Sequence, residues 1–150
     1  MRISTRGEYG LRTLLDLAQH GGRDPIPLRQ IAARQEVSEH YLEQLMGVLR
    51  KAGFVTSVRG AQGGYRLAMP PEQMTVGDVL RALEGDVEIR VDDGGPLGTD
   101  ARCVPKYGTR FLWRELNRRI VELLDSMTVA ELLVHAERER AQRSEYVYYI

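Results

Sequence analysis

The stretch SVRGAQGGYRL, residues 57–67, limits the possible folds of this 150-residue chain more than any other segment. Strand-like sequences flank it, FVTSV at 54–58 and YRLAM at 65–69. A tight hairpin needs only two turn residues. The extra residues here include Arg59 and several glycines, which allow the backbone to approach another molecule closely. Glycine loops that bind nucleotides lead from a strand into a helix, whereas this loop leads into a strand, so a nucleotide site is not expected.

Three helices are expected before the hairpin. Thr5 lies three residues before Glu8, which is the spacing of a capping box and predicts the start of the first helix. A second, short helix is expected over residues 27–35, and Ser38 is a good N-cap for a third helix. Only residues 36–38 separate the second helix from the third, as in a helix-turn-helix.

This order of elements predicts a mainly α fold with a small β-hairpin wing, which is a winged helix-turn-helix. The expected DNA-binding domain covers residues 1–85, with the wing at about 54–69. Residues 86–108 are rich in glycine, proline and acidic residues, and predict a flexible loop. Residues 109–150 are expected to form a long dimerisation helix and a C-terminal segment.

The long helix carries an apolar stripe that is longer than a domain of this size needs. Because a symmetric dimer is the commonest soluble oligomer, we interpret the stripe as a homodimer interface. The alternative is a helix folded back on its own domain. The stripe consists of Leu112, Leu116, Ile120, Leu123, Leu124 and Met127.

The outward face of the third helix and the glycine loop carry groups that suit DNA. Gln44 is able to form two hydrogen bonds with adenine, and Glu43 is able to accept one from cytosine. Arg59 at the tip of the hairpin suits a narrow minor groove. Arg50 lies on the same helix face, and Lys51 suits a phosphate contact. The alternative interpretation is an ordinary solvated helix face.

The charge distribution and the absence of other motifs narrow the class of protein. The net charge is zero, but residues 1–69 carry 10 Lys and Arg against 6 Asp and Glu, whereas residues 70–150 carry 11 against 15. A positive half is typical of a polyanion partner. No signal peptide and no membrane-spanning run is found, and the single cysteine fits a reducing compartment, so we expect a cytoplasmic protein. No metal-ligand cluster and no G-x-S-x-G elbow occurs, so an enzyme is not expected.

Three segments within the first 85 residues resemble the Rrf-type winged-helix transcriptional regulators, above all YLEQL followed by RGAQGGY. The resemblance implies a homodimeric regulator of transcription whose two winged helices bind double-stranded DNA at a palindromic operator. It also assigns the residues that contact DNA. Near the DNA backbone these are Arg2, Thr5, Arg6 and Tyr9. On the recognition helix they are Ser38, Tyr41, Glu43 and Gln44, and in the minor-groove wing they are Arg59, Gly60 and Gly63.

Cysteine content separates the branches of this family. Members that bind an iron–sulfur cluster carry three cysteines in the loop before the long helix, and this chain has only Cys103 there. A [2Fe–2S] centre needs four protein ligands, mostly thiolates, so we expect no cluster, no metal and no other cofactor. Arg102 and Lys106 lie close to Cys103 in the sequence, and neighbouring cations favour thiol oxidation. A redox-responsive regulator that uses Cys103 is therefore one alternative.

The C-terminal sequence EYVYYI resembles the terminus of the cysteine-metabolism repressors in this family, which also lack the cluster cysteines. This resemblance implies a repressor of cysteine and sulfur metabolism. It further implies that Tyr149 and Ile150 bind O-acetylserine sulfhydrylase (cysteine synthase). The alternatives are that the terminal aromatic residues pack against the dimer helix, or that the chain is a protein-interaction module that has lost DNA binding.

Overall fold

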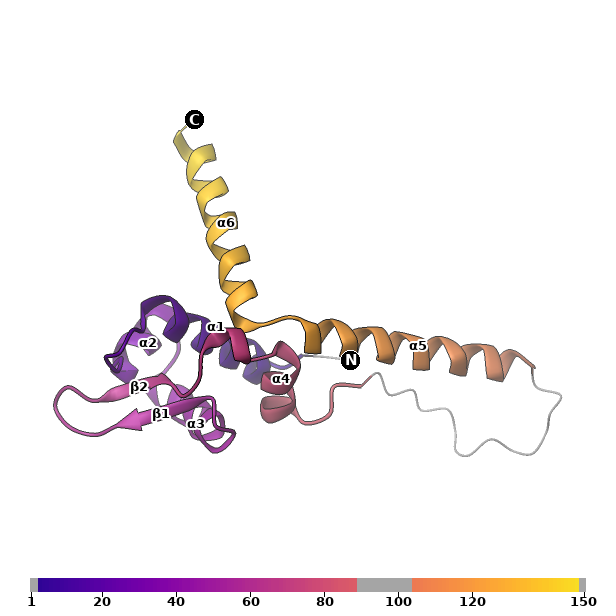
Figure 1. Ribbon diagram of the computed structural model, residues 1–150, viewed down its shortest axis with the longest axis horizontal. Helices are drawn as coiled ribbons and strands as arrows, with labels where there is room; N and C mark the ends of the chain where they lie inside the picture. The colour runs from indigo at the N-terminus through magenta and orange to yellow at the C-terminus, as the bar shows by residue number, and fades with distance from the viewer. Residues whose placement is uncertain (1–2, 89–103, 149–150) are drawn as a thin grey trace.

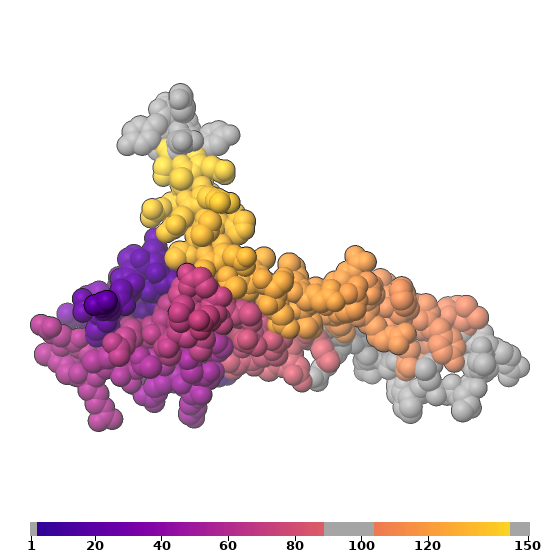
Figure 2. Space-filling view, in the orientation of Figure 1, coloured from indigo at the N-terminus to yellow at the C-terminus, as the bar shows by residue number. Residues whose placement is uncertain are grey.

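The computed structural model describes residues 3–88 and 104–148. Helices α1 to α4 and a hairpin gather into one body, from which α5 and α6 extend in different directions (Figures 1 and 2). This mainly helical arrangement with one two-stranded sheet confirms the predicted fold class. The elements are α1 (Thr5–His20), α2 (Leu28–Gln35), α3 (Glu39–Lys51), β1 (Val55–Val58), β2 (Gly64–Leu67), the 3-10 helix η1 (Pro71–Gln73), α4 (Val76–Glu84), α5 (Val104–Ser126) and α6 (Val129–Tyr148).

The helix-turn-helix forms as the sequence predicts. Glu36 ends α2 in the left-handed conformation, with φ of 56°, and turns the chain toward α3. Ser38 is the N-cap of α3, and its hydroxyl accepts a hydrogen bond from the Tyr41 amide at 3.1 Å. Local hydrogen bonds therefore define the turn itself.

The core lies between α1, α3, α4 and the hairpin. The apolar stripe of α3 is buried, and one side of α1 and of α4 packs against it. Burial of side chains of this size contributes about 1.5–3 kcal/mol each. The most deeply buried members are Leu14, Leu17, Ile31, Leu42, Leu45, Met46, Leu49, Val55, Met74, Val79 and Val129.

The hairpin pairs β1 with β2 in an antiparallel register, from Val55 opposite Leu67 to Val58 opposite Gly64. A further bridge joins β2 to the segment before α2, where the amide and carbonyl of Ile26 each bond to Tyr65 at 2.8 Å. This bridge holds the base of the wing against α2.

Helix α1 starts differently from the expectation. Its N-cap is Ser4 rather than Thr5, and the Ser4 hydroxyl accepts a hydrogen bond from the Arg6 amide at 3.2 Å. The reason lies in α4, because the Glu84 carboxylate accepts from the Ser4 amide at 3.0 Å and from the Gly7 amide at 2.8 Å. A distant acid therefore takes the role that Glu8 was expected to have.

Helix α5 begins at Val104, so the loop expected over residues 86–108 ends earlier than predicted. Pro105 lies in the first turn of this helix, where its missing amide costs nothing, and Gly108 is accommodated in the second turn. None of the residues of α5 is buried in the single chain.

A short joint connects α5 and α6 to the body. The Val76 amide donates to the Met127 carbonyl at 2.8 Å, and the Val129 amide donates to the Met74 carbonyl at 2.9 Å. Thr128 and Glu131 form a capping box at the start of α6, with amide-to-side-chain distances of 2.8 and 3.2 Å. Within the described residues, no helix is both long and apolar enough to cross a membrane.

Candidate nucleic-acid interface

The outer face of α3 presents polar side chains to solvent. Glu43 and Gln44 are exposed in the first half of the helix, as predicted for residues that read base edges. The amide nitrogen of Gln44 lies 3.3 Å from Nε2 of His40, one turn earlier on the same face. Lys51, in the last turn, is also exposed. The residues of this face that were predicted from the sequence thus lie together on one helix.

The wing is shaped by its glycines. Gly60 has φ of 114°, a left-handed conformation that favours glycine. Gly63 does not have a positive φ, but a β-carbon there would collide with the Val58 carbonyl. Gly64 combines both restrictions, with φ of 153° and a β-carbon position against the Ile26 carbonyl. Arg59 is exposed at the entry to the loop.

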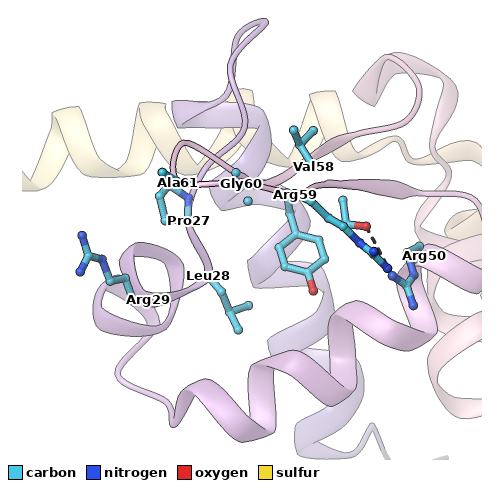
Figure 3. Close-up of a pocket in the computed structure, with 12 residues that line it drawn as sticks. Pro27, Leu28, Arg29, Arg50, Val58, Arg59, Gly60 and Ala61 are labelled. Carbon is cyan, nitrogen blue, oxygen red and sulfur yellow. Dashed lines mark hydrogen bonds between the residues drawn. The ribbon is translucent and has the colours of Figure 1, made fainter.

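An open groove of about 570 Å³ lies between the wing, the start of α2 and the end of α3. Arg29 from α2, Arg50 from α3 and Arg59 from the wing all line it. In Figure 3, Arg29 lies at one end of the groove and Arg50 at the other. Arg50 donates a long hydrogen bond of 3.4 Å to the Ser57 hydroxyl, which holds its side chain against the hairpin. A groove lined by three cations suits an anionic backbone such as that of DNA.

The sequence did not identify Arg29 as a member of this site. It lies on the short α2, and its place beside the wing depends on the bridge between Ile26 and Tyr65. No periodicity in the sequence reports that contact, so only the folded chain shows it.

Tyr9 and Tyr41 pack against one another instead of pointing outward. Their rings meet edge to face, with centroids 6.0 Å apart and an interplanar angle of 87°. The Arg12 guanidinium lies 5.0 Å from the centre of the Tyr9 ring. The Tyr41 hydroxyl is buried and has no hydrogen-bond partner among the described residues. This placement favours a role in holding α3 against α1.

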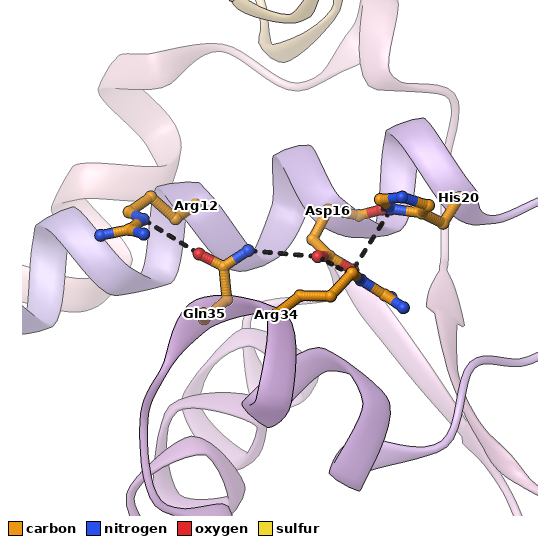
Figure 4. A network of polar contacts seen from close by, with 5 residues as sticks. All are labelled: Arg12, Asp16, His20, Arg34 and Gln35. Atoms are coloured by element: carbon orange, nitrogen blue, oxygen red, sulfur yellow. Dashed lines mark hydrogen bonds and ion pairs between the residues drawn. The ribbon is translucent and has the colours of Figure 1, made fainter.

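A polar network missed by the sequence reasoning fixes α2 against α1 (Figure 4). The Asp16 carboxylate, with 2% of its side chain exposed, accepts hydrogen bonds from Arg34 at 2.9 and 2.6 Å. Gln35 donates to the same carboxylate at 3.1 Å and accepts from Arg12 at 2.9 Å. Nδ1 of His20 lies 3.7 Å from this carboxylate and 3.1 Å from the backbone carbonyl of Asp16. The network fixes the position of α2, and the short turn after α2 then sets the position of α3.

The remaining candidate residues are divided between the surface and the undescribed parts of the chain. Thr5 and Arg6 are exposed at the start of α1. Four residues lie outside the described residues, namely Arg2, Cys103, Tyr149 and Ile150. Within the described part of the chain, no group of three His, Cys, Asp or Glu residues is placed to hold a metal ion.

The fold agrees with comparisons to known proteins. Residues 3–135 match the family model Rrf2, described as an iron-dependent transcriptional regulator. The chain belongs to the Rrf2 family. Two similar Rrf2-family sequences are the regulator IscR of Vibrio cholerae, 41% identical over 91% of this chain and 78% of IscR, and the regulator CymR of Bacillus subtilis, 39% identical over the full length of both. The solved structure of CymR, the global cysteine regulator of B. subtilis, matches with a TM-score of 0.76 at 40% identity, over 90% of this chain and 98% of CymR. These Rrf2-family relatives are DNA-binding transcriptional regulators rather than enzymes, in agreement with the sequence-based prediction.

Proposed function

We propose that this chain is a homodimeric repressor that binds a two-fold symmetric operator and controls genes of cysteine and sulfur metabolism. The observation that carries the proposal is the groove lined by Arg29, Arg50 and Arg59 beside the exposed Gln44 face of α3. A recognition helix in the major groove and a cationic wing on the adjacent minor groove together require such an arrangement.

The exposed apolar side chains of α5 support the dimer. They remain exposed in the single chain, with 63% exposure for Phe111, 46% for Leu112 and 57% for Leu123. Glu115 accepts hydrogen bonds from Arg118 and Arg119 of the same helix, which lower the pKa of its carboxyl to about 2, so this charge is paired within the chain. Exposed apolar side chains spaced along one helix are typical of an interface, and a second copy of this chain is the partner we propose.

We propose that the repressor works without an iron–sulfur cluster. The chain contains one cysteine, Cys103, and three histidines. A [2Fe–2S] centre needs four protein ligands, mostly thiolates, and these residues do not fit it. We therefore do not expect this chain to depend on iron, although the family is described as iron-dependent.

The cysteine-metabolism role is supported by the match to CymR over the full length of both chains. We propose on this basis that the C-terminal Tyr149 and Ile150 bind O-acetylserine sulfhydrylase. Titration of the enzyme with the unaltered chain and with a chain lacking Ile150 tests this, and equal affinity would refute it.

Selection of DNA from a random duplex library by the purified protein tests the repressor proposal. We expect a two-fold symmetric sequence to be enriched. Arg59→Ala should bind this sequence at least about tenfold more weakly, equivalent to about 1.4 kcal/mol. Arg138→Ala is a matched control because Arg138 lies on α6, outside the groove. The absence of any enriched sequence would overturn the proposal.

A further inference from the structure

Arg81 connects α4 to the end of α5. Its Nη2 atom donates to Asp78 of its own helix at 2.9 Å and to Asp125 of α5 at 2.6 Å. Asp125 lies in the last turn of α5, where the partial negative charge of the helix end disfavours an acidic residue. The bond to Arg81 compensates for this unfavourable position. We therefore interpret Asp125 as a residue of the contact between the two helices.

Gly77 makes this contact possible. It is buried in the first turn of α4, and a β-carbon at this position would collide with the Asp125 carboxylate. The absence of a side chain here allows the end of α5 to approach α4 closely.

Backbone hydrogen bonds also hold the joint between the body and α5. The two backbone hydrogen bonds that link Met74 and Val76 to Val129 and Met127 form a single short bridge. One short bridge limits the separation of two elements more than it limits the angle between them. The ion pair between Arg81 and Asp125 adds a second attachment on α5 itself, and two attachments define a direction.

We propose that Gly77, Arg81 and Asp125 are positioning residues that set the spacing of the two half-sites in the operator. This inference rests on the proposed homodimer. In a dimer joined through α5, the angle between α5 and the body determines how far apart the two α3 helices lie and how they are rotated. Each base pair inserted between half-sites moves them by about 3.4 Å along the duplex and turns one relative to the other. A fixed angle therefore selects one spacing.

A series of operators tests the inference. The sequence selected by the unaltered protein is lengthened or shortened by one and two base pairs at its centre, and the affinity for each duplex is measured. We expect the unaltered protein to prefer the original spacing by at least tenfold. Asp125→Ala and Gly77→Ala should reduce that preference to less than about threefold, while their affinity for a duplex with a single half-site stays unchanged.

Two further variants separate positioning from a general effect on the fold. Asp78→Ala removes the partner of Arg81 within α4 and keeps the contact with α5, so its spacing preference should match that of the unaltered protein. Arg81→Lys should retain part of the preference. If Asp125→Ala and Gly77→Ala keep the full preference for the original spacing, the inference is wrong, although the repressor proposal stands. If the unaltered protein binds no duplex, both are wrong.

Discussion

The Asp16 carboxylate of α1 is almost completely buried and accepts both of its shortest hydrogen bonds from Arg34 of α2, at 2.9 and 2.6 Å. The guanidinium binds the carboxylate in a bidentate geometry, and the hydrogen bonds to Asp16 raise the pKa of Arg34 above its ordinary value. Since only a short turn joins α2 to α3, the pair also determines the position of the recognition helix.

Removal of Arg34 should destabilise the protein because it leaves a buried charge without its main partner. For Arg34→Ala we expect a decrease of about 2–3 kcal/mol in the free energy of unfolding, less than the roughly 3–5 kcal/mol of a fully buried pair because a third of the Arg34 side chain is exposed. Urea unfolding measures this. The double variant Asp16→Leu, Arg34→Met should lose less free energy of unfolding than the sum of the losses in Asp16→Leu and Arg34→Met measured alone. Additive losses would contradict the coupling.

Glu84 should make the stability depend on pH. Burial alone would raise the pKa of its carboxyl, but hydrogen bonds from Ser4 and Gly7 outweigh that effect and hold the pKa below the ordinary 4.5. A lowered pKa in the folded state gives stability that is present above pH 4.5 and is lost as the pH falls through the folded-state value. Glu84→Gln should therefore be less stable at pH 7, by about 1 kcal/mol, and this difference should shrink below pH 4.5. A difference independent of pH would exclude the charge as its cause.

Two glycines should respond to alanine with opposite signs. Nothing lies within 4 Å of a β-carbon placed on Gly47 in α3, so Gly47→Ala should raise the free energy of unfolding by up to about 1 kcal/mol. At Gly64, alanine meets both a positive φ and the Ile26 carbonyl, so Gly64→Ala should lower it by more than about 1 kcal/mol. Thermal unfolding of both variants checks the sign. A stabilised Gly64→Ala would mean that the wing does not need this conformation.

Gln44 and Lys51 should affect DNA binding in different ways. Removal of a side chain that reads a base should weaken the binding free energy by about 1–3 kcal/mol and relax the specificity at that base pair. We expect this of Gln44→Ala. Lys51→Ala should weaken binding uniformly across sequences and lower the salt dependence by about one counterion. Binding to a panel of operator variants at several salt concentrations distinguishes the two, and identical profiles would contradict the assignment.

The apolar residues of α5 should control self-association. Leu112→Glu places a charge among the exposed apolar side chains and should convert the dimer to a monomer at micromolar concentration, as measured by analytical ultracentrifugation. Arg114→Glu places the same side chain about half a turn away and should leave the dimer intact. Dissociation of both variants, or of neither, would argue against this face.

The sequence predicts best those features that nearby residues determine. The Ser38 cap and the short turn before it each depend on residues within a few positions, and the structure confirms them. The start of α1 was misplaced because its decisive partner, Glu84, lies 80 residues beyond Ser4. Two strong N-cap residues stand side by side there, and local rules do not choose between them.

The predicted site shows the same division. Exposed polar residues of α3 and the tip of the wing follow from helix periodicity and from the glycine pattern. Arg29 joins the groove through a backbone bridge, and Tyr41 turns inward to meet Tyr9 on another helix. Both depend on contacts between segments that are distant in sequence, which neither spacing nor composition reports.

The Glu84 carboxylate of α4, which lies against the start of α1, affects any ligand that approaches this end of the helix. Free amides at the beginning of a helix commonly attract anions. Here Glu84 already takes the amides of Ser4 and Gly7, so this end of the helix carries a negative group of its own. Attraction of a nucleic acid to this end must then come from the side chains of Thr5 and Arg6, and it should follow ionic strength more closely than base sequence.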